Sequence, residues 1–288
     1  MAYSKYELLY LIKILDYYEP ALVRIIKYYI NTITFKKPKN KLINKELKDV
    51  VNKWCNKETV QECKLEYGHI SYWDVSLITD MSELFRYRYD RYKKYKQFNE
   101  DISRWNVSNV ISMKNMFRDL DYFNQNINNW DVSKVNNMKS MFKNNEDFNQ
   151  PLNDWNVSNV IDMESMFEDT KYFNQYIGDW NVSNVTDMSY MFKNAECFNQ
   201  YIGDWDISNV KSIYSMFEGT DEFNQYIGGW DVSNVQCMND LFYESIKFNQ
   251  PLTKWNPINC QVLINDMFFN AKSFNQPKTI AHFKKFEN

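Results

Sequence analysis

The amino-acid sequence predicts a repeat solenoid of about eight 25-residue units, with a helical segment at its N-terminal end. Three observations lead to this fold class. Tryptophans recur at a fixed interval, with six successive spacings of 25 residues between Trp105 and Trp255. Within each unit the spacing of apolar residues changes once, from every second residue to every third. The residues before position 70 lie outside the period. An internal repeat of this length is typical of a solenoid.

One unit, residues 177–200, has the sequence IGDWNVSNVTDMSYMFKNAECFNQ. Trp180 and Val182 alternate as on a strand, whereas the apolar residues from Val185 to Phe192 are spaced as on one side of a short helix. This spacing predicts one strand, one turn and one short α- or 3₁₀-helix per unit. Because so short a unit cannot bury its own apolar face, its neighbours on either side must cover it.

Two repeated positions are predicted to form structural columns along the solenoid. Periodic apolar side chains are normally core, which predicts a buried tryptophan column formed by Trp105, Trp130, Trp155, Trp180, Trp205 and Trp230. The F-N-Q motif that ends each unit contains a recurrent asparagine. Its amide carries both donors and an acceptor, so stacked copies can satisfy backbone groups. We expect an asparagine ladder formed by Asn124, Asn149, Asn174, Asn199, Asn224 and Asn249.

The repeat frame W-x-V-S-x-V-T-x-M-x-x-M-F-x-x-A-x-x-F-N, over about residues 68–276, resembles the BspA-like leucine-rich-repeat family. That family includes the mycoplasma lipoprotein-associated repeat of unknown function. The resemblance implies a leucine-rich-repeat-like, right-handed and curved solenoid that is used for recognition, usually on cell surfaces. This sequence departs from many members because it shows no secretion or lipid-anchor signal. We therefore expect an intracellular, cytoplasmic protein without a signal peptide; another route to a surface or particle stays an alternative.

Four segments are predicted: a helical hairpin at 1–36, a helical N-terminal cap at 37–69, the solenoid at 70–276 and a C-terminal tail at 277–288. The hairpin resembles a degenerate F-box, the helical motif that docks on the Skp1 adaptor of ubiquitin ligases. This resemblance implies an adaptor-docking face formed by Leu8, Leu9, Ile14 and Leu15. The alternative is that the hairpin extends the cap.

The position after F-N-Q varies between units and is therefore not fixed by packing. Three adjacent units place a tyrosine there: Tyr176, Tyr201 and Tyr226. If the side chains point outward, they form an aromatic stripe suited to a protein partner, because tyrosine is enriched at interfaces. The alternative is a self-stacked ladder that shields the repeat.

One unit contains an insertion between Phe85 and Phe98, with the sequence RYRYDRYKKYKQ. Basic residues interleaved with tyrosines are typical of surfaces that bind RNA or an acidic protein. The candidate polyanion-binding residues are Arg86, Arg88, Arg91, Lys93, Lys94 and Lys96. The alternative is a solvated charged helix.

The sequence offers no catalytic constellation, metal site or cofactor motif. Its two histidines lie far apart, and its five cysteines lack the CxxC spacing of a zinc site. The net charge of −3 disfavours nucleic acid as a partner, and no apolar run approaches the roughly 20 residues that span a bilayer. We therefore expect a non-catalytic protein-binding scaffold that acts through the solenoid surface. The alternatives are an F-box substrate adaptor for a ubiquitin ligase and a self-associating structural subunit.

Overall fold

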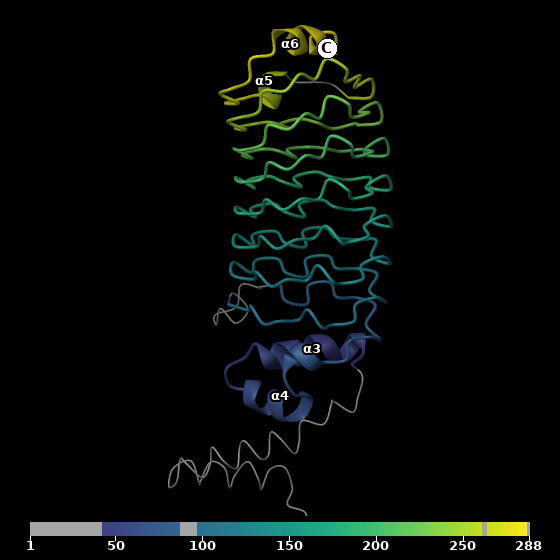
Figure 1. Cartoon of the computed structure of the whole chain (residues 1–288), viewed down its shortest axis with the longest axis vertical. Helices are drawn as coiled ribbons and strands as arrows, with labels where there is room; N and C mark the ends of the chain where they lie inside the picture. The colour runs from purple at the N-terminus through teal and green to yellow at the C-terminus, as the bar shows by residue number, and fades with distance from the viewer. Residues whose placement is uncertain (1–41, 87–96, 261–263, 287–288) are drawn as a thin grey trace, which may run out of the picture.

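The computed structural model describes residues 42–86, 97–260 and 264–286. Its body is a stack of similar coils along one axis, with the helices α3 and α4 at one end and α5 and α6 at the other (Figure 1). Equivalent residues of neighbouring coils lie above one another, 25 positions apart in sequence. The predicted tandem repeat and its solenoid-like body are thereby confirmed.

The predicted strand and short helix of each unit are wrong. Within the described residues 97–260, the backbone forms a succession of turns without a regular helix or strand. Extended pairing is limited to one column of isolated parallel bridges, one residue per coil, which links Asp80, Ser112, Asn137, Asp162, Asp187, Ser212 and Cys237.

Left-handed residues explain why the apolar spacing does not produce a helix. In the coil that begins at Met138, Met141 N donates to Met138 O (3.1 Å), and Ser140 inside this turn has φ 54°. Asn145 N then donates to Phe142 O (3.0 Å), and Asn144 has φ 58°. A left-handed residue at the third position is typical of type II turns and cannot occur inside an α-helix. Two successive turns thus give the same three-residue spacing of buried side chains as a helix.

Backbone hydrogen bonds join neighbouring coils on this side of the solenoid. Alternate amides donate to the coil above, as in Asn115 N to Lys139 O (2.9 Å) and Phe117 N to Met141 O (2.9 Å). Lys193 Nζ also lies 2.8 Å from Glu218 Oε1 of the next coil. We call this side the turn face, residues 160–173, 185–198, 210–223 and 235–248.

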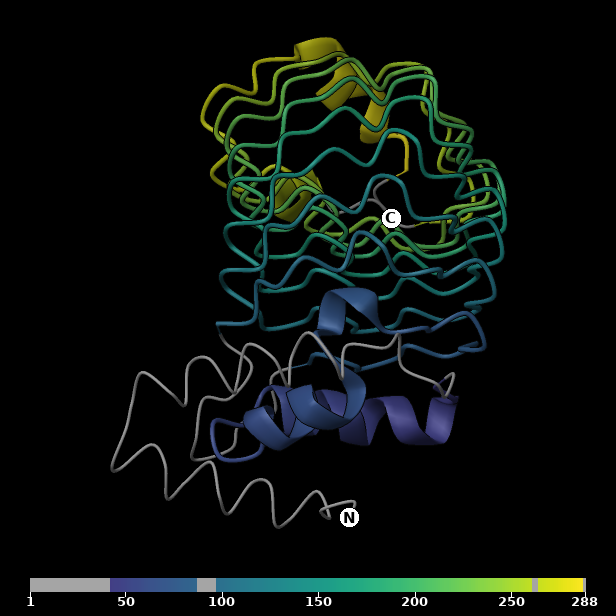
Figure 2. The same cartoon turned by 60° about the horizontal axis from the view of Figure 1, so that its bottom comes forward.

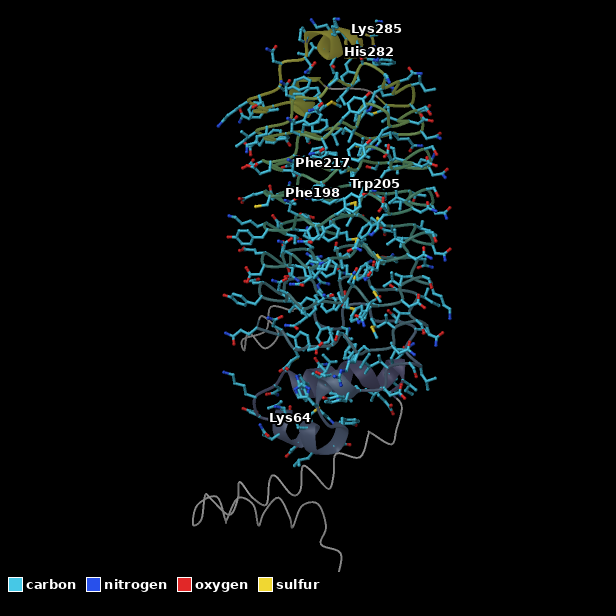
Figure 3. The ribbon with its side chains drawn as sticks, in the orientation of Figure 1. Lys64, Phe198, Trp205, Phe217, His282 and Lys285 are labelled. Atoms are coloured by element: carbon cyan, nitrogen blue, oxygen red, sulfur yellow. The ribbon has the colours of Figure 1, made fainter. Side chains whose placement is uncertain are left out.

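Aromatic side chains stack into columns within the core, beside buried Val, Ile and Met side chains (Figure 3). Phe192 stacks on Phe217 of the next coil at 5.8 Å between ring centres, and on Phe198 of its own coil at 4.0 Å. The tryptophans are 3–5% exposed, apart from the fully buried Trp255. Trp205 Nε1 donates to Ile177 O of the coil below (3.2 Å), and the same bond recurs from Trp105 to Trp255. The indole N–H is therefore satisfied although the ring is buried.

Helices cover the first coil. Helix α3 (Asn44–Trp54) buries Leu47, Val50, Val51 and Trp54, the four residues whose spacing predicts one apolar face. The Trp54 ring lies 5.7 Å from the ring of Trp73, the tryptophan of the first coil. Helix α4 (Val60–Tyr67) and the short helix η1 (Ile70–Tyr72) connect α3 to Trp73. Figure 2 shows these helices beneath the stack.

At the other end, α5 (Ile264–Met267) is followed by α6 (Pro277–Phe283). Phe283 is fully buried, with its ring 6.4 Å from that of Trp255, and Thr279 Oγ1 accepts a hydrogen bond from Leu252 N (3.1 Å). Residues 277–288, predicted as a C-terminal tail, thus contain a helix that covers Trp255. None of the helices in the described part of the chain has the length and apolar character needed to cross a membrane.

Candidate protein-binding face

Each coil has a second side, across the core from the turn face and its backbone hydrogen bonds. This side runs from the asparagine of F-N-Q to the asparagine of V-S-N. We call this side the amide face, residues 149–159, 174–184, 199–209 and 224–234. Side chains rather than backbone pairs join the coils here. Asn199 Oδ1 accepts hydrogen bonds from Asn224 N (3.0 Å) and Gln225 Nε2 (2.9 Å) of the next coil, and this ladder runs from Asn99 to Asn275.

A second asparagine ladder lies at the other edge of the amide face. Asn209 Nδ2 donates to Ser183 O of the coil below (2.8 Å), and the bond recurs at Asn109, Asn159, Asn184, Asn234 and Asn259. This ladder is not among the columns predicted from the sequence. Its signal was present, because the motif V-S-N recurs with the same period as the tryptophans.

The residue after each tryptophan from Trp73 to Trp230 caps a tight turn. Asp206 Oδ1 accepts a hydrogen bond from Ser208 N (3.0 Å), and Asp231 does the same with Ser233 (2.9 Å). Hydrogen bonds from the serine hydroxyl and amide lower the pKa of both carboxyls. Both therefore remain ionised on the solvent side of the amide face.

The three predicted tyrosines form an exposed row on the amide face. Tyr176, Tyr201 and Tyr226 are 44%, 40% and 38% exposed. Tyr176 Oη donates to Asp179 Oδ1 (2.8 Å), and Tyr201 Oη donates to Asp204 Oδ1 (3.0 Å). These hydrogen bonds, which require the protonated phenol, raise the pKa of both tyrosines.

A glycine two residues later fixes each tyrosine ring against its own coil. A Cβ atom on Gly178 would lie 2.8 Å from Tyr176 Cε2 and 2.6 Å from Tyr201 O of the next coil. The ring edge thus occupies the space of the missing side chain. The units without this tyrosine have Ser103, Asn128, Asn153 or Thr253 in place of the glycine. Tyrosine and glycine therefore form one local motif, Y-I-G, which holds the ring in a single position.

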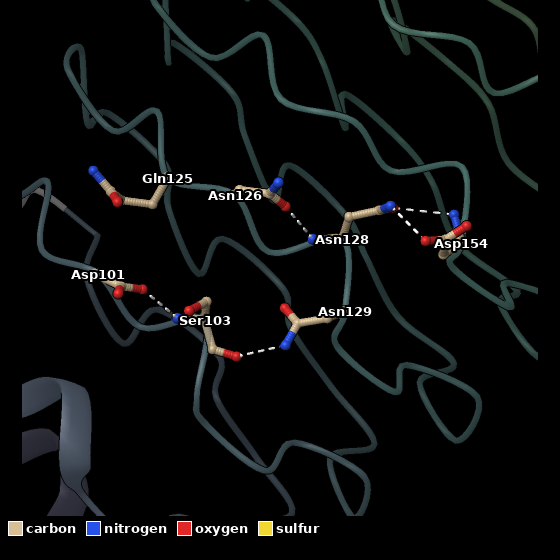
Figure 4. Close-up of a pocket in the computed structure, with 7 residues that line it drawn as sticks. All are labelled: Asp101, Ser103, Gln125, Asn126, Asn128, Asn129 and Asp154. Carbon is tan, nitrogen blue, oxygen red and sulfur yellow. Dashed lines mark hydrogen bonds between the residues drawn. The ribbon is translucent and has the colours of Figure 1, made fainter.

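Where the tyrosines are absent, the same side of the solenoid is hollowed (Figure 4). The pocket has a volume of about 480 Å³ and a polar lining of Asp101, Ser103, Gln125, Asn126, Asn128, Asn129 and Asp154. Asn128 Nδ2 donates to Asp154 Oδ2 (2.7 Å), and Asn126 Oδ1 accepts from Asn128 N (3.0 Å). Carboxylate and amide groups converge here without a basic residue in the lining.

Two other predicted sites fall mostly outside the described residues. Of the basic insertion only Arg86 is described, and its Nη1 lies 2.8 Å from Glu83 Oε1. Arg88, Arg91, Lys93, Lys94 and Lys96 lie outside the described residues, as do Leu8, Leu9, Ile14 and Leu15 of the F-box-like segment. Among the residues that are described, no three His, Cys, Asp or Glu side chains gather as a metal-binding group would require.

Sequence comparison places the repeat in a family. Residues 55–179, 88–204 and 167–283 each match the family described as Mycoplasma protein of unknown function, DUF285, so the matches extend together over residues 55–283. The chain belongs to the DUF285 family. No curated protein matches it. The three DUF285 matches cover all the coils of the tyrosine row and of the polar pocket, as well as α4 and α6.

Proposed function

We propose that this DUF285 chain is a non-catalytic scaffold that binds another protein through its amide face, as a recognition solenoid of the BspA-like leucine-rich-repeat type. The observation that carries the proposal is the row of Tyr176, Tyr201 and Tyr226. Large aromatic side chains with few rotatable bonds lose little conformational entropy on binding. Here a glycine packs against each ring, and a carboxylate also holds Tyr176 and Tyr201.

The composition around the row also favours protein recognition. Its exposed positions are Asn, Gln, Asp, Gly and Ser beside the tyrosines, a mixture that is also typical of antibody combining sites. Rigid aromatics supply contact area, whereas amides and hydroxyls supply adaptable hydrogen bonds. The coil stack holds these groups on a fixed scaffold, as a preorganised binding surface requires.

The test compares two sets of tyrosines on one molecule. Proteins captured from the native host by the full chain are quantified beside those captured by the variant Tyr176→Ala, Tyr201→Ala, Tyr226→Ala. The matched control is Tyr122→Ala with Tyr172→Ala, because these side chains are 51% and 48% exposed but lie outside the row. We expect a protein that the wild type and the control retain and the triple variant loses. Equal capture by all three chains would contradict the proposal.

The F-box adaptor stays an alternative that concerns residues 1–36. Titration of the full chain with a Skp1-like adaptor tests it independently of the amide face, since the tyrosine variants leave that segment unchanged. The structural-subunit alternative predicts oligomers whose population rises with protein concentration, which sedimentation analysis measures.

A further inference from the structure

We propose that the amide face binds a segment of a partner protein that is rich in lysine and arginine. This inference rests on the proposed function and specifies the partner. Its first support is the charge distribution. The four coils of the amide face present Asp154, Asp179, Asp204, Asp206 and Asp231, and their segments contain no Lys, Arg, His or Glu.

The lysines of the same coils all lie on the turn face, where most of them already have partners. Lys171 lies 3.2 Å from Glu196, Lys193 pairs with Glu218, and Lys247 pairs with Glu222. Within these four coils the basic residues are thus separated from the tyrosines, whereas Arg104, Lys134 and Lys254 occupy amide-face positions in the coils on either side. A single-sign surface attracts partners of opposite charge and repels those of the same charge. Nucleic acid and anionic membrane surfaces are therefore disfavoured on the amide face.

Tyr176 and Tyr201 each lie beside a carboxylate, so ring and carboxylate are positioned to bind the same cation. The Tyr176 hydroxyl is 2.8 Å from the Asp179 carboxylate, so a guanidinium placed over the ring also lies close to a negative charge. Cations are attracted to the faces of aromatic rings, and arginine is used most often. Such a pair is present among the described residues: the Arg104 guanidinium lies 5.1 Å from the centre of the Tyr72 ring.

The polar pocket extends the proposed surface beyond the row. Asp154 belongs both to the pocket and to the amide face, while Asp101 lies at the far side of the pocket. Hydrogen bonds from Ser103 lower the pKa of Asp101, which keeps that carboxyl ionised. Because Arg104 and His69 already act on Asp101, an extended basic segment that lies along the tyrosine row would place a further cationic side chain beside Asp154.

The experiment measures the affinity of the full chain for a short synthetic peptide of alternating Arg-Lys and Gly-Ser pairs, by fluorescence anisotropy at physiological salt. Two variants alter the amide face. One is the triple tyrosine variant. The other replaces four carboxylates isosterically: Asp179→Asn, Asp204→Asn, Asp206→Asn and Asp231→Asn. Asparagine is compatible with these positions, because Asn129, Asn156 and Asn181 occupy the equivalent positions in other coils.

The matched control removes four charges from the turn-face side of the solenoid: Glu146→Gln, Asp147→Asn, Asp221→Asn and Asp240→Asn. We expect both amide-face variants to bind the peptide roughly tenfold more weakly or worse, and the control to bind like the wild type. Higher salt should weaken wild-type binding. Thermal melts followed by circular dichroism establish that each variant is folded.

Three results would overturn the inference. Equal weakening by both sets of carboxylate variants would mean that net charge alone attracts the peptide. Unchanged binding by the triple tyrosine variant would exclude the row. A wild-type chain that fails to bind the peptide while a host protein is still captured in a tyrosine-dependent manner would refute the basic partner and leave the proposed function standing.

Discussion

At the scale of single residues, the Y-I-G motif shows how one glycine determines the position of an exposed ring. Gly178 has neither a positive φ nor a helical role; it is required because Tyr176 and the next coil occupy the space of a side chain. In the neighbouring coil the equivalent positions hold Pro151 and Asn153 in place of the tyrosine and the glycine. Residue identity at these two positions is therefore coupled.

We predict that Gly178→Asn destabilises the protein by about 1–3 kcal/mol, because the new Cβ overlaps both Tyr201 O of the next coil and the Tyr176 ring. The double variant Tyr176→Pro, Gly178→Asn reproduces the neighbouring coil and should recover the part of the lost free energy of unfolding that the ring causes. Gly229→Asn is the control, since a Cβ there meets nothing within 4 Å. Chemical denaturation measures all three. An equal loss in the single and double variants would show that the tyrosine ring is not the cause.

At the scale of the repeated element, the two asparagine ladders use opposite ends of the amide. Asn199 accepts hydrogen bonds through Oδ1, whereas Asn209 donates through Nδ2 to Ser183 O. Carboxylate oxygens can replace the acceptor but not the donor. The two ladders should therefore respond differently to the same substitution.

We predict that Asn199→Asp is nearly neutral at pH 7, whereas Asn209→Asp costs about 1 kcal/mol, because an ionised carboxyl then faces a carbonyl oxygen. Protonation would restore a donor, so the folded state raises the pKa of the carboxyl introduced at position 209. The stability of that variant relative to wild type is then greatest at low pH and falls as pH rises through this raised pKa. Thermal melts between about pH 3 and pH 7 measure this. Equal costs at both sites would contradict the assigned roles.

At the scale of the whole molecule, stability is summed over coils and their nearest neighbours, between helices at both ends. Deletion of one repeat should therefore shorten the stack without destroying it. Removal of residues 200–224 joins Asn199 to Gln225 in the same frame. In the shortened chain Lys193 lies beside Tyr243 in place of Glu218, so no like charge faces it.

We predict that the protein lacking residues 200–224 unfolds cooperatively, with lower stability and a smaller denaturant dependence, because less surface is buried. Removal of residues 175–199 should also give a folded chain but a less stable one, since it places Glu168 against Glu218. Removal of residues 200–211 breaks the register and should abolish cooperative unfolding. Urea denaturation of the three deletions measures this. A cooperative transition in the half-repeat deletion would show that the coils do not require their register.

The period of the repeat and its buried residues follow from the amino-acid sequence alone. Stacking makes each residue meet its equivalent 25 positions further on, so only a strictly repeated apolar frame can fill the core. The same reasoning predicts the first asparagine ladder and the variable tyrosine position. The backbone of each coil, in contrast, depends on contacts between coils. The three-residue spacing of Met138 and Met141 fits a helix and a turn equally well, and Ser140 or Tyr190 gives no local signal for positive φ. Hydrogen bonds to the neighbouring coils stabilise that conformation, as in Ser140 N to Glu164 O and Tyr190 N to Tyr214 O.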